Sequence, residues 1–231
     1  SFCFMMNDTE ASTEQLMLFC LEGGYLKMKL HVDLKERGYD IVLERGVLNR
    51  IAEEIDVGRR ILLVSDSGVP AKWVELVRAQ CPDCVVKIVR SGEEAKSFPV
   101  WEELLLCMKE HHFVRKDLVI ALGGGVVGDL AGFAAACYMR GIDLRQHPHH
   151  HAFSRSIPAS EERRPSTQAG SKNNVGAFWQ PRKVLIDLDV LATLPRRHYI
   201  NGLAEALKAG LIYDRSCSPC LSSRISTPIW K

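Results

Sequence analysis

The chain has 231 residues, 46% of them hydrophobic, and a formal net charge of +2. This length and composition suffice for one or two domains with a buried core, and the small net charge argues against an extended basic surface for nucleic acids or membranes. No apolar run approaches the roughly 20 residues that span a bilayer. The polar, acidic stretch Asn7–Glu14 does not fit a secretory signal, so we expect a soluble cytoplasmic protein.

Strands and helices are expected to alternate after the first 38 residues. Strands are predicted at Tyr39–Glu44, Arg60–Asp66, Val85–Val89 and Leu118–Leu122, the last of which no polar residue interrupts. Between them, apolar residues at helical spacing predict helices at Val47–Ile55, Ala71–Ala79 and Pro99–His111. This alternation predicts an α/β fold, a Rossmann-like parallel sheet wrapped by helices, with ligands bound at the carboxyl ends of the strands.

The most informative segment is Leu118–Asp143, LVIALGGGVVGDLAGFAAACYMRGID. A buried strand runs into three glycines, and a helix-forming stretch follows. Gly123, Gly125 and Gly128 fit G-x-G-x-x-G, in which bare backbone lets a phosphate approach the N–H groups at a helix N-terminus. The same spacing is also typical of a tight strand-to-helix turn that simply needs glycine. Because Asp66 ends a neighbouring strand, both features lie where a dinucleotide is expected.

The longer string GGGVVGDLAGFAAACYMRGID resembles the signature of the 3-dehydroquinate synthase family. Further matching pieces follow the family order: SGEEAKS at Ser91–Ser97, KNNVGAFWQP at Lys172–Pro181, DLDVLATLP at Asp187–Pro195 and GLAEALKAGLIYD at Gly202–Asp214. The resemblance runs from about Tyr39 to Asp214. It implies a lyase of the shikimate pathway, which makes chorismate and the aromatic amino acids. The enzyme converts 3-deoxy-D-arabino-heptulosonate 7-phosphate to 3-dehydroquinate and phosphate. The implied cofactors are NAD and a divalent metal (zinc or cobalt), and the implied assembly is a homodimer.

The resemblance assigns roles to individual residues. The residues implied for NAD are Asp66 at the adenosine ribose, Glu93 and Lys96 at ribose and phosphate, Gly124, Gly125 and Asp129 at the pyrophosphate, and Thr193 at the nicotinamide half. The metal is implied to bind Glu205. Arg140, Lys172, Asn173 and Lys208 are implied to contact the substrate, whose carboxylate and phosphate suit cations. The family's asparagine two positions after Asp66 is Gly68 here, which weakens the ribose contact.

Taken without the resemblance, the same residues have simpler interpretations. Asp129 near a helix start fits an acid that the helix dipole favours. Glu205 and Lys208 are three positions apart and fit an ordinary helix ion pair. Thr193 fits a turn hydroxyl, and the remaining charged residues fit a solvated surface.

Three segments depart from the family pattern. Residues 1–27 match nothing in it, and Met28 suits a start, so we interpret them as a non-native extension. Residues 28–195 form the predicted NAD-binding domain, and 196–214 begin a helical metal and substrate domain that is mostly missing. A single Glu is too few for catalytic zinc, which usually has several protein ligands, so the chain itself is expected to be inactive.

The segment Leu144–Ser171 includes His147, His149, His150 and His151, which at face value form a metal-binding tract in a charged linker. Plausible codons for Leu144–Ser154, read one base later, give FVNIPTTMLS. Codons from Ser156 onward, read one base earlier, give VDSSIGGKTAV, and both products resemble the substrate and NAD loop of the family. Arg215–Ser222, read out by one base, gives PELFALFE. We therefore hypothesise that 144–171 and 215–231 are out of frame.

Two C-x-x-C pairs, Cys81–Cys84 and Cys217–Cys220, are too far apart for a zinc-ribbon spacing, and ordinary reduced cysteines are the simpler interpretation. Three other functions remain open. One is a sister sugar-phosphate cyclase that makes an inosose or a valiolone. Another is a glycerol-dehydrogenase-like alcohol dehydrogenase, although its glycine loop does not continue as VVGDLAGF. The last is a non-catalytic fragment that at most binds a nucleotide.

Overall fold

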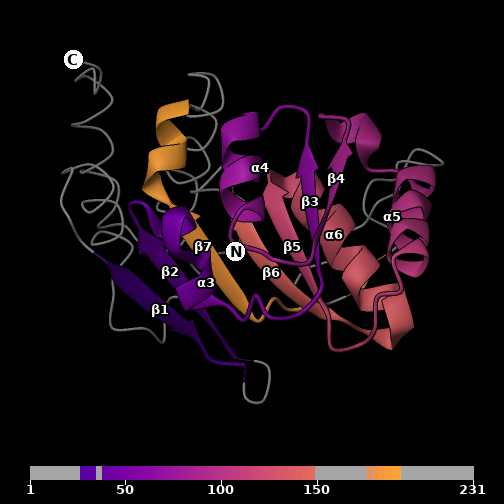
Figure 1. The fold of residues 1–231 in the computed structure, drawn as a ribbon, viewed down its shortest axis with the longest axis horizontal. Helices are drawn as coiled ribbons and strands as arrows, with labels where there is room; N and C mark the ends of the chain where they lie inside the picture. The colour runs from indigo at the N-terminus through magenta and orange to yellow at the C-terminus, as the bar shows by residue number, and fades with distance from the viewer. Residues whose placement is uncertain (1–26, 35–37, 149–175, 178, 194–231) are drawn as a thin grey trace, which may run out of the picture.

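The computed structural model describes residues 27–34, 38–148, 176–177 and 179–193 (Figure 1). These residues form one seven-stranded sheet in the order β1-β2-β7-β6-β5-β3-β4. All neighbouring strands are parallel except the edge pair β1 and β2, which is antiparallel. The strands are β1 (Met28–Val32), β2 (Tyr39–Glu44), β3 (Ile61–Asp66), β4 (Cys84–Val89), β5 (Leu118–Gly123), β6 (Asp143–Pro148) and β7 (Lys183–Asp187).

Helices cover both faces of the sheet (Figure 1). One face carries the 3-10 helix η2 (Val47–Arg50), α3 (Ile51–Glu54) and α4 (Ala71–Arg78), which pack on β3, β5 and β7. The other face carries α5 (Phe98–Glu110) and α6 (Gly125–Cys137), which pack on β3, β5 and β6. Short 3-10 turns complete the described chain: η3 (Glu93–Ala95), η4 (Tyr138–Arg140) and η6 (Leu188–Thr193). The predicted parallel sheet wrapped by helices is confirmed.

The predicted strands agree with β2, β3, β4 and β5 to within one residue at each end. The helices predicted at 71–79 and 99–111 are α4 and α5. The one predicted at 47–55 is a 3-10 turn followed by a single α-helical turn. Sequence reasoning missed β1, β6 and β7. Because β6 spans Asp143–Pro148, the interpretation of the whole 144–171 stretch as a linker is wrong for its first residues.

Strand β5 and helix α6 pack against each other and position the glycine turn between them. Every residue of β5 is buried, as expected for a parallel strand with both faces covered. Small side chains on α6 let the helix lie close to the sheet, and Ala131, Ala134 and Ala135 are fully buried there. Within the described part of the chain, no helix combines the length and apolarity needed to cross a membrane.

Candidate dinucleotide site

The glycine turn lies at the carboxyl end of β5, and packing requires glycine at some of its positions but not at others. A Cβ at Gly123 would lie 2.6 Å from Cγ2 of Val127, so the packing of the turn requires glycine there. Gly124 caps α6 without a side-chain hydrogen bond, and Gly125 is the first helical residue. Among the described residues, a Cβ at Gly125 would meet no atom within 4 Å beyond its chain neighbours and its own helix backbone. Packing in the described structure therefore does not require glycine at position 125, and the N–H groups of the first helical turn have no partner within the helix.

Lys96 and Asp129 form a buried ion pair beside this turn. Nζ of Lys96 lies 2.8 Å from Oδ2 of Asp129, and the two side chains are only 11% and 9% exposed. Oε1 of the exposed Glu93 lies 3.7 Å from the same Nζ. Asp129 is the fifth residue of α6 and lies outside its first turn, so its interpretation as a helix-capping acid is wrong. The pair instead joins the segment after β4 to α6.

Asp66 lies at the same edge, as the last residue of the neighbouring strand β3, and is 7% exposed. Its Oδ1 accepts a hydrogen bond from the backbone N–H of Gly68 at 2.7 Å. A Cβ at Gly68 would lie 2.9 Å from that oxygen, so glycine rather than asparagine suits this turn. The N–H of Ser91 donates to Oγ of Ser67 at 3.0 Å, which ties the ends of β3 and β4 together.

Thr193 ends η6 beside helix α4. Its Oγ1 accepts a hydrogen bond from Nε1 of Trp73 at 3.1 Å and donates one to the carbonyl of Val190 at 2.8 Å. The hydroxyl is thus engaged in local contacts, as expected for a turn residue, and its role at the nicotinamide half stays a prediction.

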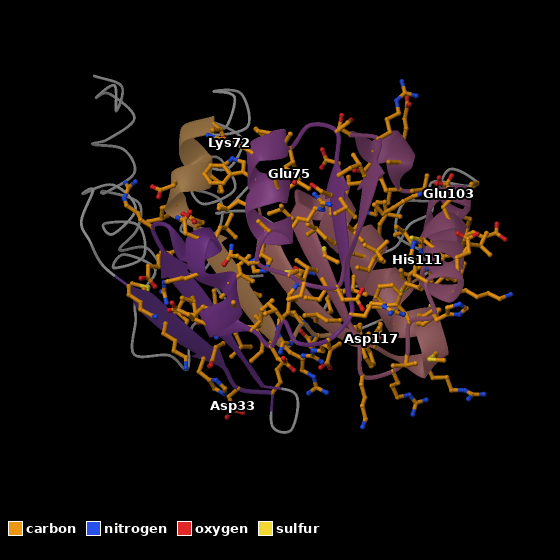
Figure 2. All side chains as sticks on the ribbon, viewed as in Figure 1. Asp33, Lys72, Glu75, Glu103, His111 and Asp117 are labelled. Carbon is orange, nitrogen blue, oxygen red and sulfur yellow. The ribbon has the colours of Figure 1, made fainter. Side chains whose placement is uncertain are left out.

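Arg140 lies at the opposite edge of the sheet from the glycine turn. It belongs to η4, between the end of α6 and the amino end of β6, and the 13 residues of α6 separate it from Gly124. Asp117, labelled in Figure 2, lies at the same amino edge, directly before β5. Arg140 lines a cavity of about 730 Å³ together with Arg59, Arg115, Lys116 and Arg182, among others. Within this chain, therefore, the structure does not bring Arg140 to the predicted NAD residues.

The other predicted site residues, Lys172, Asn173, Glu205 and Lys208, lie outside the described residues, as do His149–His151 and the second C-x-x-C pair. Cys81 and Cys84 are free thiols in contact with each other, a contact that lowers the pKa of Cys81 and raises that of Cys84. Among the residues that the structure does describe, no group of three or more His, Cys, Asp or Glu is placed to hold a metal.

Known proteins are similar to this chain in sequence and in fold. The family model described as 3-dehydroquinate synthase N-terminal matches residues 86–201. The chain belongs to the 3-dehydroquinate synthase family. It is 38% identical over 193 residues to the 3-dehydroquinate synthase of Alkaliphilus metalliredigens (strain QYMF), covering 80% of this chain and 52% of the relative. It is 41% identical over 191 residues to that of Caulobacter vibrioides (strain NA1000 / CB15N), covering 79% and 51%.

The chain therefore spans about half the length of the 3-dehydroquinate synthases that it matches. A solved structure of 2-deoxy-scyllo-inosose synthase, complexed with carbaglucose-6-phosphate, NAD+ and Co2+, superposes with a TM-score of 0.68 at 27% identity. The match covers 76% of this chain and 50% of that one. The expected family is thus confirmed, and a sugar-phosphate cyclase shares the fold.

Proposed function

We propose that this chain is the NAD-binding half of a 3-dehydroquinate synthase. The complete protein would convert 3-deoxy-D-arabino-heptulosonate 7-phosphate to 3-dehydroquinate and phosphate in the shikimate pathway. One observation carries the proposal: within the described part of the chain, no side chain or loop fills the space in front of Gly125, at a helix N-terminus on the carboxyl edge of a parallel sheet. Dinucleotides bind at such edges, with their phosphates at the helix N-terminus.

The residues around this space suit NAD. We assign the pyrophosphate to the backbone of Gly124 and Gly125, and the adenosine ribose hydroxyls to the carboxylate of Asp66. Lys96, held by Asp129, offers a fixed positive charge at the same edge, and the exposed Glu93 next to it can accept from a ribose hydroxyl. When bound, NAD supplies reversible oxidation of a substrate alcohol, while the protein holds the reactants and excludes water.

The substrate and metal residues belong to the same proposal. Lys172, Asn173 and Lys208 are assigned to supply cations and an amide for a phosphorylated sugar acid. Arg140 is assigned to the same substrate, although within one chain it lies at the opposite edge of the sheet from the NAD residues. Glu205 is assigned to the divalent metal, zinc or cobalt. One carboxylate is too few for a catalytic metal, so this chain alone is expected to be inactive. We place the NAD-binding domain at 28–195 and the start of the metal domain at 196–214, and we assign a cytoplasmic homodimer to the complete protein.

A sister cyclase is the second candidate, because 2-deoxy-scyllo-inosose synthase shares the fold. Sequence identity favours the first: 38% and 41% to 3-dehydroquinate synthases against 27% to the inosose synthase. Calorimetric titration of the full chain with NAD, with and without zinc, tests the proposal. We expect weak NAD binding that zinc does not change. If NAD produces no binding signal, the proposal is wrong; if zinc strengthens NAD binding, the chain holds a more complete metal site than proposed.

A further inference from the structure

Strand β6 carries polar residues at a position of the sheet that favours apolar ones. It lies between β5 and β7, with parallel neighbours on both sides. Such strands are covered on both faces and normally read as continuous apolar runs. Strand β5, LVIALG, follows this rule, whereas β6 reads DLRQHP.

His147 lies in an apolar row across the sheet. It pairs with Leu122 of β5, and extending the register in which Gln146 pairs with Val184 places Leu185 of β7 on its other side. Both leucines are 1% exposed and belong to one hydrophobic cluster, and His147 is equally buried. Neither ring nitrogen has a well-formed hydrogen bond within the described chain. Burial lowers the pKa of His147 to about 3, which a weak contact with the Leu185 backbone only partly offsets.

Arg145, two residues earlier on the same face of β6, is half-buried. It pairs with the fully buried Ile120 of β5 and with Lys183 of β7. Its Nε is buried without a hydrogen-bond partner in the described structure, and its Nη1 makes only a long 3.4 Å contact with the carbonyl of Leu144. Burial lowers the pKa of Arg145 to about 10. A buried polar group without a partner destabilises the folded state.

The residues directly before Arg145 fit their surroundings. Ile142 is buried in the cluster between the sheet and the α5–α6 layer, and so is Leu144. Asp143 accepts hydrogen bonds from Nη1 of Arg59 at 2.9 Å and from Nε of Arg182 at 3.1 Å. The mismatch between sequence and sheet therefore begins between Asp143 and Arg145.

We propose that the bases encoding β6 are translated one base out of frame from about Leu144 onward, and that the in-frame strand is apolar at 145 and β-branched at 147. Burial in the sheet supports this independently of the proposed function. Histidine codons are CAT and CAC, and the next codon, for Pro148, begins with C. Read one base later, position 147 becomes isoleucine or threonine. At position 145, the shifted codon consists of the last two bases of the arginine codon and the first base, C, of the Gln146 codon. Depending on the arginine codon used, it encodes valine, alanine, glycine or aspartate. Isoleucine, threonine and valine are residues that strands favour.

The stability of the full chain tests whether apolar residues at positions 145 and 147 fit the sheet better than the arginine and histidine present. We expect the double variant R145V/H147I to raise the unfolding midpoint by roughly 5 °C or more, or to give a cooperative transition where the parent has none. The matched control R90V/H31I exchanges the same residue types at exposed positions and is expected to give no such gain. A midpoint of R145V/H147I at or below that of the parent would overturn the inference, whatever the outcome of NAD titration.

The coding DNA tests whether the bases that encode β6 are translated out of frame. We expect the bases from Leu144 to Ser154, read one base later, to form an open frame with valine or alanine at position 145. Glycine or aspartate at 145, or a stop codon within that stretch, would show that β6 is in frame as printed. Neither result depends on whether the chain binds NAD.

Discussion

Lys96 and Asp129 meet 2.8 Å apart across the edge of the sheet where the glycine turn lies. They are 33 residues apart in sequence and lie in two separate motifs, GEEAKS and GGGVVGD. Their pairing holds a cation that is 11% exposed beside the N-terminus of α6. The sequence shows only that these two motifs follow each other in the family order, whereas the structure shows that they are in contact.

Replacing Lys96 is expected to destabilise the chain, because Asp129 would lose its buried cation. We expect K96M to lower the free energy of unfolding by about 3 kcal/mol, measured by urea denaturation. The double variant K96M/D129L is expected to recover part of this loss, since no buried carboxylate remains. Lys87 and Glu103, whose side chains are 31% and 57% exposed, provide the control pair. K87M is expected to cost less than about 1 kcal/mol, and an equal loss in K87M and K96M would contradict the special role of the buried pair.

A side chain at Gly125 is expected to block NAD without disturbing the fold. A Cβ there meets no neighbouring side chain or loop of the described chain within 4 Å, but it points into the space that we assign to the pyrophosphate. We expect G125V to weaken NAD binding at least roughly tenfold, about 1.4 kcal/mol, while the unfolding midpoint stays within a few degrees. The control G132A, on the same helix, places a Cβ in ordinary contact with Leu144 at 3.6 Å and is expected to bind NAD normally. Equal NAD affinities for G125V and G132A would show that the dinucleotide does not bind at this turn.

The sequence predicted the parts of the fold whose signals are local. The segments Ile61–Val64 and Leu118–Leu122 are continuously apolar, and glycine follows the second, so the strands and the turn were predictable. Strand β6 was not, because Arg145 and His147 remove the apolar run that identifies a buried strand. The position of Arg140 was not predictable either, since motif order does not say which edge of the sheet a residue occupies. The structure places it where strands begin, away from Asp66 and Lys96.

The sequence identifies Asp187 only as the first residue of the motif DLDVLATLP. In the structure, its carboxylate accepts hydrogen bonds from the backbone. The carboxylate is 1% exposed and accepts three backbone hydrogen bonds, each of 2.9 Å, from Gly46, Leu48 and Asp189. It therefore fixes the start of η2 against the end of β7. We expect D187A to lower the free energy of unfolding by about 3 kcal/mol, because buried N–H groups lose their acceptor. D189A, which removes an exposed partner of Arg45, is expected to cost less than about 1 kcal/mol. Similar losses in the two variants would contradict this role.

The pH dependence of stability is expected to reveal His147. The pKa of this ring is lowered from 6.5 to about 3 in the folded chain, so between these values the unfolded chain binds a proton that the folded chain does not. Stability therefore falls as the pH drops through this window, by at most about 1.4 kcal/mol per pH unit from this group. Asp40, Glu54 and Asp143, whose pKa values are lowered by their cationic neighbours against the effect of burial, add a further loss mainly below about pH 4.5.

Denaturation of the parent and of H147I, measured from about pH 7 to about pH 5, isolates the histidine from those carboxylates. The parent is expected to lose stability across this range, and H147I is expected to lose much less. Leu185, buried beside position 147, supplies the control: L185V trims the same apolar layer without adding or removing a titrating group, so it is expected to keep the slope of the parent. Parallel slopes for the parent and H147I would mean that the ring at position 147 reaches water, and that β6 tolerates a histidine in the layer between Leu122 and Leu185.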